Sequence, residues 1–164
     1  MTFVVDGTNG LTFPNSTTQA SASKVLQVVS AVFTTPTTIA STSFTDTGVS
    51  LAITPSSTSS KILIVVSQPA TLSRVSTALN VDYQLLRGSS SIFNGGRAFG
   101  LFVAGVSEID ATSVLNAVYL DSPATTSSTT YKTQAKMSTT ANSAVVLFQT
   151  NSAVSSITLM EIAV

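Results

Sequence analysis

The sequence contains no histidine, cysteine or tryptophan, and charged residues make up only 9% of it. Histidine is the side chain that most often moves protons near neutral pH, and cysteine and clustered carboxylates supply much of the remaining enzyme chemistry. Without cysteine there is no disulfide framework, so the sequence does not restrict the redox compartment. These absences predict a protein that is not an enzyme and that carries no cofactor.

An excess of charge of one sign is also lacking, because seven Lys and Arg residues balance seven Asp and Glu residues. A nucleic-acid-binding face needs a surplus of basic side chains, so we expect no nucleic acid partner. No apolar run approaches the roughly 18 residues of a membrane span, and the opening MTFVVDGTNG lacks the basic and apolar regions of a signal peptide. We therefore expect neither membrane insertion nor export by that route.

Apolar residues make up 43% of the chain, and serine and threonine dominate the polar remainder. This apolar content is sufficient for the core of one domain. A surface so poor in charge must be covered by hydroxyl groups or by other copies of the protein. A net charge of zero also removes the self-repulsion that keeps subunits apart, which favours association.

Short β-branched or alternating segments recur along the chain, each closed by turn-forming residues. Residues 49–54 alternate as in a half-buried strand, and Lys61–Ser67 is a continuous apolar run typical of a central strand. The one weak helical candidate, residues 70–79, contains β-branched residues that argue against it. The pattern predicts an all-β sandwich or barrel. The expected strands are residues 25–33, 38–45, 49–54, 61–67, 79–86, 98–103, 112–120, 129–137, 144–150 and 156–164.

The first 24 residues differ from the rest, which divides the chain into predicted segments 1–24 and 25–164. Two short apolar runs flank Asp-Gly and Asn-Gly pairs, which favour turns, and a stretch of small polar residues follows. Such a segment buries too little to fold alone, so we expect an extended arm that attaches to a partner chain. The expected attachment residues are Phe3, Val4, Val5, Leu11 and Phe13.

Glu108 and Asp110 are the most closely spaced carboxylates, and on a strand they would share one face. They are candidates for an acidic pair or a cation site, although a solvated loop between strands is the interpretation we favour. A glycosidase needs two carboxylates across a sugar. Glu108 with Asp121 or Asp82 is an alternative that the spacing does not favour. A serine nucleophile would lack a histidine base.

The glycine-rich stretch NGGRAFG, residues 94–100, lacks the spacing and the strand-to-helix context of a phosphate-binding loop. It is predicted to be a hairpin loop. Arg97 would lie at its tip, as either an ordinary exposed arginine or a contact for an anionic glycan. We treat Asn94 and Arg97 as a candidate receptor-contact loop.

Several segments resemble, in order, a module at the C-termini of tailed-bacteriophage (cyanophage-like) tail-fibre and appendage proteins. DGTNGLTFPNSTTQAS (Asp6–Ser21) is similar to a short connector of those proteins, and SFTDTGVSLAITPSSTSSKILIVVS (Ser43–Ser67) to their central block. YQLLRGSSSIF (Tyr83–Phe93), YKTQAKM (Tyr131–Met137) and SSITLMEI (Ser155–Ile162) are similar to the blocks that follow.

The resemblance implies a jelly-roll-like antiparallel β-sandwich that assembles as a homotrimer. It further implies a virion structural protein, assembled in the bacterial host cytoplasm, that contacts other tail or capsid proteins and binds a host-surface glycan or protein. One departure is that the module spans nearly the whole sequence, without a long upstream shaft. That departure leaves a capsid decoration (cement or head-fibre) protein as the alternative to a tail-fibre or appendage component.

Overall fold

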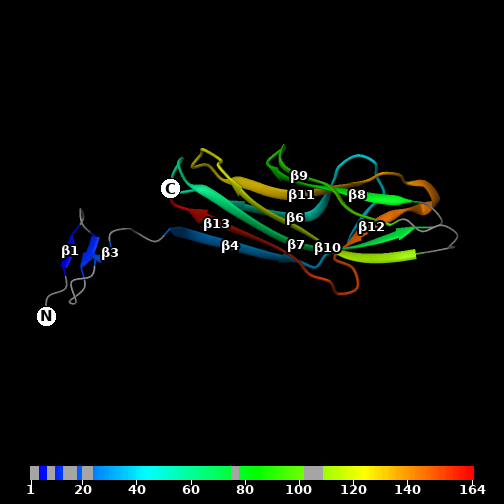
Figure 1. The fold of residues 1–164 in the computed structure, drawn as a ribbon, viewed down its shortest axis with the longest axis horizontal. Coiled ribbons are helices and arrows are strands. Elements are labelled where there is room, and N and C mark those ends of the chain that lie inside the picture. The colour runs from blue at the N-terminus through cyan, green and yellow to red at the C-terminus, as the bar shows by residue number, and fades with distance from the viewer. Residues whose placement is uncertain (1–3, 7–9, 13–17, 20–23, 75–77, 102–108) are drawn as a thin grey trace.

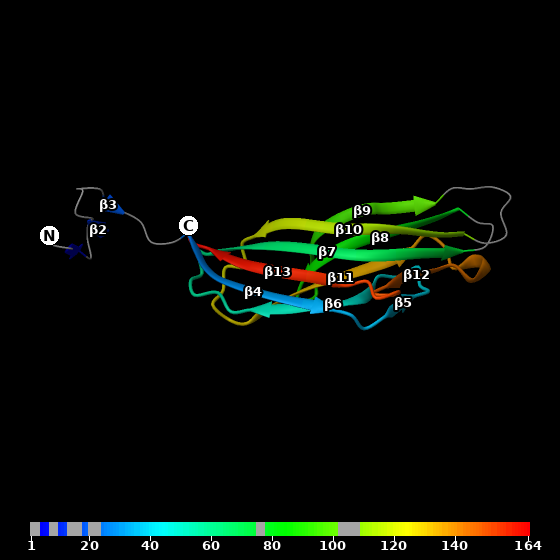
Figure 2. The ribbon, with the colours of Figure 1, turned by 90° about the horizontal axis from the view of Figure 1, so that it is seen from below.

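The computed structural model describes residues 4–6, 10–12, 18–19, 24–74, 78–101 and 109–164. These residues form an antiparallel β-sandwich of two sheets, which confirms the predicted fold class (Figures 1 and 2). Within them, the only helical segment is a 3₁₀ turn at Ala141–Ser143. Among the described residues no helix is long and apolar enough to span a membrane.

Sheet I has β7 at its centre, with β13 and then β12 along one edge and β10 along the other. β4 lies outside β13, and β5 lies outside β12. Its strands are β4 (Val25–Phe33), β5 (Thr37–Ile39), β7 (Lys61–Arg74), β10 (Ile109–Asp121), β12 (Val145–Phe148) and β13 (Ser155–Ile162).

Sheet II is four-stranded, in the order β6-β11-β8-β9. Its strands are β6 (Thr45–Ile53), β8 (Leu79–Arg87), β9 (Ser90–Leu101) and β11 (Thr129–Met137). Four antiparallel pairs are nested in the sequence, each pair enclosing the next: β4–β13, β6–β11, β7–β10 and, innermost, β8–β9. Nested antiparallel pairs divided between two packed sheets are the jelly-roll arrangement.

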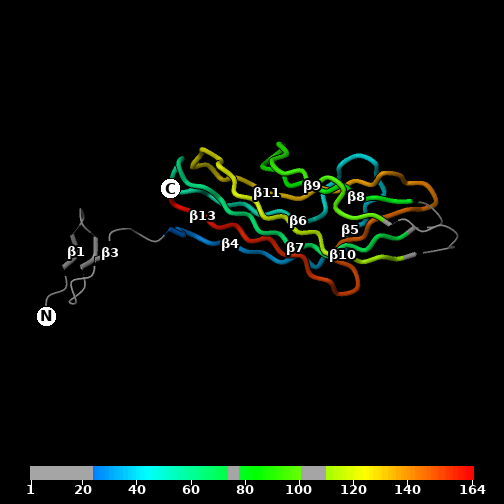
Figure 3. The backbone as a smooth tube through the Cα atoms, viewed as in Figure 1, coloured from blue at the N-terminus to red at the C-terminus, as the bar shows by residue number. Residues whose placement is uncertain are grey.

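The core lies between the sheets, because alternate side chains of each strand point inward. Ile62, Ile64 and Val66 of β7 are buried together with Val81 and Leu85 of β8. The first strand of the sandwich, β4, and the last strand, β13, lie side by side (Figure 3). Next to them the Ala163 N–H donates to the Lys24 carbonyl at 2.8 Å.

The expected arm contains three short strands, β1 (Val4–Asp6), β2 (Gly10–Thr12) and β3 (Thr18–Gln19). They pair with one another as a separate small sheet, apart from the sandwich in Figure 1. Val4, Val5 and Leu11 lie on β1 and β2, whereas Phe3 and Phe13 fall outside the described residues.

The predicted hairpin loop at residues 94–100 is wrong, because these residues continue β9. The chain turns earlier, at Gly88, where φ is +58°. Gly95 and Gly96 instead accommodate a bulge, since Tyr83 pairs with Gly96 while its neighbour Gln84 pairs with Asn94. Similarly, residues 46–48, expected to end a strand, lie inside β6.

Candidate interaction surfaces

The outer face of sheet I carries apolar side chains across its four long strands. The strand register aligns Val28 of β4, Met160 of β13, Leu63 of β7 and Leu120 of β10 in one row. Val28 is 53% exposed and Leu120 is 48% exposed. The row is therefore accessible to a partner and is not part of the core.

The neighbouring row mixes apolar and hydroxyl side chains: Ser30, Thr158, Val65 and Val118 lie side by side. Val118 is 64% exposed. We call the eight residues of these two rows the apolar face.

Charge is confined to the ends of this surface. Lys61 lies at one end of β7, and Asp110 lies at the far end of β10. Between them, the outward positions of the described strands of sheet I hold no charged side chain. A partner would therefore remove no ion from water when it covers this surface.

The size of the surface is in the range of interaction patches. The whole outer face of the four long strands, which lie about 4.8 Å apart and are each about eight residues long at about 3.3 Å per residue, covers roughly 500 Å². The apolar face makes up about half of this area. The largest apolar patches on monomers reach about 300–600 Å², and one partner in a stable interface buries about 800 Å². Because side chains standing on the sheet add accessible area, the whole outer face of the four long strands can supply most of one standard interface.

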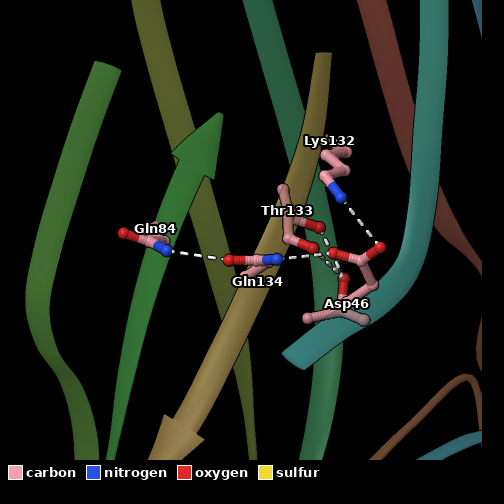
Figure 4. A network of polar contacts seen from close by, with 6 residues as sticks. Asp46, Gln84, Lys132, Thr133 and Gln134 are labelled. Atoms are coloured by element: carbon pink, nitrogen blue, oxygen red, sulfur yellow. Dashed lines mark hydrogen bonds and ion pairs between the residues drawn. The ribbon is translucent and has the colours of Figure 1, made fainter. Parts of the chain in front are cut away.

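The outer face of sheet II has the opposite character. Lys132 of β11 donates to Asp46 of β6 at 2.9 Å, and Gln134 donates to the other carboxylate oxygen of Asp46 at 2.7 Å (Figure 4). Gln84 of β8 donates in turn to Gln134 at 2.9 Å. Burial alone would raise the pKa of Asp46, but these hydrogen bonds and the Lys132 charge lower it. The carboxylate is thus held ionised.

The carboxylates considered for catalysis do not form a described pair. Glu108 lies outside the described residues, and Asp110 is exposed on β10. Asp82 lies 3.5 Å from Lys136 on sheet II. Among the described residues, no three Asp, Glu, His or Cys side chains group together to hold a metal ion.

Asp121 is buried and fully engaged at the end of β10. Arg87 Nη1 donates to both of its carboxylate oxygens at 3.0 Å, and the Tyr131 hydroxyl donates to Oδ2 at 2.7 Å. Burial and the adjacent carboxylate both raise the pKa of Tyr131. Because Asp121 is enclosed by structural partners, the geometry gives it no access to a sugar.

Asn94 and Arg97, the candidate receptor contacts, have different surroundings on β9. The side-chain oxygen Oδ1 of Asn94 accepts the Gly96 N–H at 2.9 Å, which supports the bulge. Arg97 is exposed and makes no ion pair with another described residue. It lines a shallow groove of about 240 Å³ between β9 and β10, with Tyr83, Phe93, Gly95, Ala98, Val114, Leu115 and Asn116.

The apolar face was not anticipated as a surface. The run Lys61–Ser67 was expected to be a central strand, and it forms part of β7 at the centre of sheet I, where only its alternate residues are fully buried. The informative signal was apolar residues at the outward positions of β4 and β10, such as Val32 and Val118, which are 67% and 64% exposed.

Comparison with protein-family models finds no match, and comparison with curated proteins finds no significant match.

Proposed function

We propose that this chain is a structural protein of a bacteriophage virion that self-associates through the apolar face into a homotrimeric tail-fibre or appendage component. The observation that carries the self-association is the charge-free, exposed apolar face of sheet I. The virion setting and the number three come from the resemblance of five sequence segments to phage appendage modules.

A second copy of the chain suits this face better than a charged partner. Soluble oligomers are mostly closed symmetric assemblies of identical subunits, and in a threefold ring each copy of the face would lie toward the axis and contact both neighbouring subunits. The rows of the apolar face offer apolar and hydroxyl contacts to a neighbouring subunit. They carry no charge, so the neighbour needs no opposite charge at the interface. Association through sheet I leaves the polar face of sheet II exposed to the surroundings.

In this proposal the trimer presents three copies of any host-contacting site, and a virion presents several trimers. Weak sites per subunit then give strong attachment by multivalency. No described residue is required to perform chemistry in this role.

The experiment is a mass measurement by light scattering after size exclusion. The wild-type chain is expected at three times its subunit mass of 16.9 kDa. Val118→Lys places a charge at a 64% exposed position of the apolar face and is expected to give single subunits. The matched control, Ala52→Lys, adds the same charge at an exposed position of β6 on sheet II and should keep the trimer.

A wild-type protein that remains a monomer, or a trimer that is unaffected by Val118→Lys, would contradict self-association through this face. Antibody labelling of virions then separates the two virion roles: tail labelling is expected, whereas shell labelling would identify a decoration protein.

A further inference from the structure

The polar face of sheet II contains a groove whose origin lies in the pairing of β6 with β11. Lys132 pairs with Ser50, and Gln134 pairs with Asp46, so Thr133 alone stands opposite the three residues 47–49. Such a bulge interrupts the ladder and redirects side chains, and bulges are frequent beside binding sites.

The bulge hollows the outer surface of the sheet. Gly48, at its centre, has a φ of +88°, and an added Cβ there would lie 2.8 Å from Thr37 Oγ1 of β5. The resulting groove has a volume of about 400 Å³ and is lined by Asp46, Gly48, Val49, Ser50, Gly88, Thr130 and Lys132. Ligand pockets in proteins span about 300–1,000 Å³, so one or two sugar-sized rings match this space.

The polar groups of the groove are held in place before any ligand arrives. Asp46 receives hydrogen bonds from Lys132 and Gln134, and Gln134 is itself oriented by Gln84, so the chain of contacts crosses three strands (Figure 4). Each of these side chains retains further donor or acceptor capacity, because an ammonium has three donors and a carboxylate about four acceptor sites. Preorganised groups lose less entropy on binding.

The charged groups of the groove favour a neutral ligand over a charged one. Its one carboxylate and one ammonium already neutralise each other at 2.9 Å, so a charged ligand would have to compete with an existing ion pair. The remaining lining groups include the hydroxyls of Ser50 and Thr130 and the backbone at Gly48 and Gly88. Groups of this kind suit a ligand that is neutral and rich in hydroxyls.

We propose that the β6–β11 groove binds a neutral saccharide, with Asp46 accepting from and Lys132 donating to sugar hydroxyls. This site is present on each single subunit, so it does not depend on trimerisation. Failure of the saccharide site would leave the mass experiment unaffected, and a monomeric protein would still carry the groove.

The test is an NMR titration of the full chain with methyl glycosides of glucose, galactose and mannose at millimolar concentration. At least one glycoside is expected to shift the backbone amides of Gly48, Ser50, Gly88 and Lys132. Asp46→Asn should weaken that binding by about tenfold or more, the loss typical of a hydrogen bond to a charged group. Gly88→Asn, tolerated at a positive φ, narrows the groove and should also weaken it.

The matched control is Asp82→Asn, because Asp82 forms the other ion pair on the same face, with Lys136 at 3.5 Å, outside the groove. This variant should bind as the wild type does. The proposal would be overturned by the absence of any shift, by equal weakening in the control, or by preferential binding of glucuronate over the neutral glycosides.

Discussion

Gln68 on β7 and Tyr83 on β8 meet across the centre of the sandwich, where the tyrosine hydroxyl donates to the Gln68 side-chain oxygen at 3.2 Å. The same oxygen accepts from Thr133 of β11 at 3.0 Å and from Thr47 of β6 at 3.2 Å. All four residues are buried. One amide of sheet I therefore contacts three strands of sheet II and fixes how the sheets align.

Replacement of Gln68 with leucine is expected to destabilise the fold by about 2–4 kcal/mol, because it leaves several buried hydroxyls without their acceptor. The free energy of unfolding in urea measures the effect. Asn116→Leu, at an exposed position of β10, serves as the control and should change stability by less than about 0.5 kcal/mol. Similar stability of the two variants would show that the Gln68 cluster does not hold the sheets together.

The positions of several strands could be predicted from the sequence, whereas the contacts between distant strands could not. The expected strands at residues 25–33 and 129–137 coincide with β4 and β11, because turn residues delimit them. Leu79, Val81 and Tyr83, alternate residues of the expected strand at 79–86, are all buried. A buried glutamine such as Gln68 appears in the sequence only as a polar residue after an apolar run, so its three partners from distant segments were not predictable.

Glu161 is expected to make stability depend on pH in the acidic range. Burial alone would raise its pKa, but hydrogen bonds from Gln27, Ser56 and Ser60 outweigh burial and lower the pKa from 4.5 to about 2. A folded-state pKa below the unfolded value contributes stability that is present above pH 4.5 and is lost as the pH falls towards 2. The stability difference between wild type and Glu161→Gln should shrink over that interval.

The measurement is urea unfolding at several pH values for both proteins. At pH 6 the variant should be less stable by about 1–3 kcal/mol, because an amide in place of Glu161 can accept fewer of the hydrogen bonds made at 2.6–2.7 Å. A difference that stays constant from pH 6 to 2 would contradict the assigned role of the carboxylate.

Gly48 is expected to be required both by its backbone conformation and by the close approach of Thr37. Its φ is +88°, and an added Cβ would lie 2.8 Å from Thr37 Oγ1. Gly48→Ala should therefore cost about 1–3 kcal/mol of stability. Gly88→Ala is the comparison, since Gly88 has a φ of +58° with nothing within 4 Å of an added Cβ; it should cost less.

Removing the Thr37 hydroxyl separates the two contributions at Gly48. In a Thr37→Ala background, Gly48→Ala should cost less stability than in the wild type, because the contact with the Thr37 hydroxyl is gone. The remaining loss should be the part that comes from the backbone conformation. Full additivity of the two changes would show that Thr37 plays no part.

The groove and the apolar face were less accessible from the sequence than the strands. The groove depends on two extra residues in β6 opposite Thr133, and bulge positions follow from pairing between distant segments. Arg97 was assigned to a loop because Gly95 and Gly96 resemble a turn, although bulges use the same residue type. Only in the folded sheet do Val28 and Leu120, far apart in the chain, lie in one row.

The two ion pairs Arg87–Asp121 and Lys132–Asp46 should differ in their importance for stability. The Asp121 side chain is 7% exposed, whereas that of Asp46 is 55% exposed. Among the residues that the structure describes, Arg87→Ala leaves the Asp121 carboxylate with only the Tyr131 hydroxyl as a side-chain partner. Removing one partner of a fully buried ion pair costs about 3–5 kcal/mol.

Lys132→Ala leaves a carboxylate that water can solvate, so its expected cost is below about 1 kcal/mol. Urea unfolding at pH 7 of both variants gives the comparison, and added salt should reduce only the Lys132 contribution, because solvent screens exposed pairs far more than buried ones. Equal losses would mean that burial of Asp121 does not make its ion pair more important. A larger loss for Arg87→Ala would show that the ion pair between β8 and β10, strands of opposite sheets, contributes more to stability than the exposed pair on sheet II.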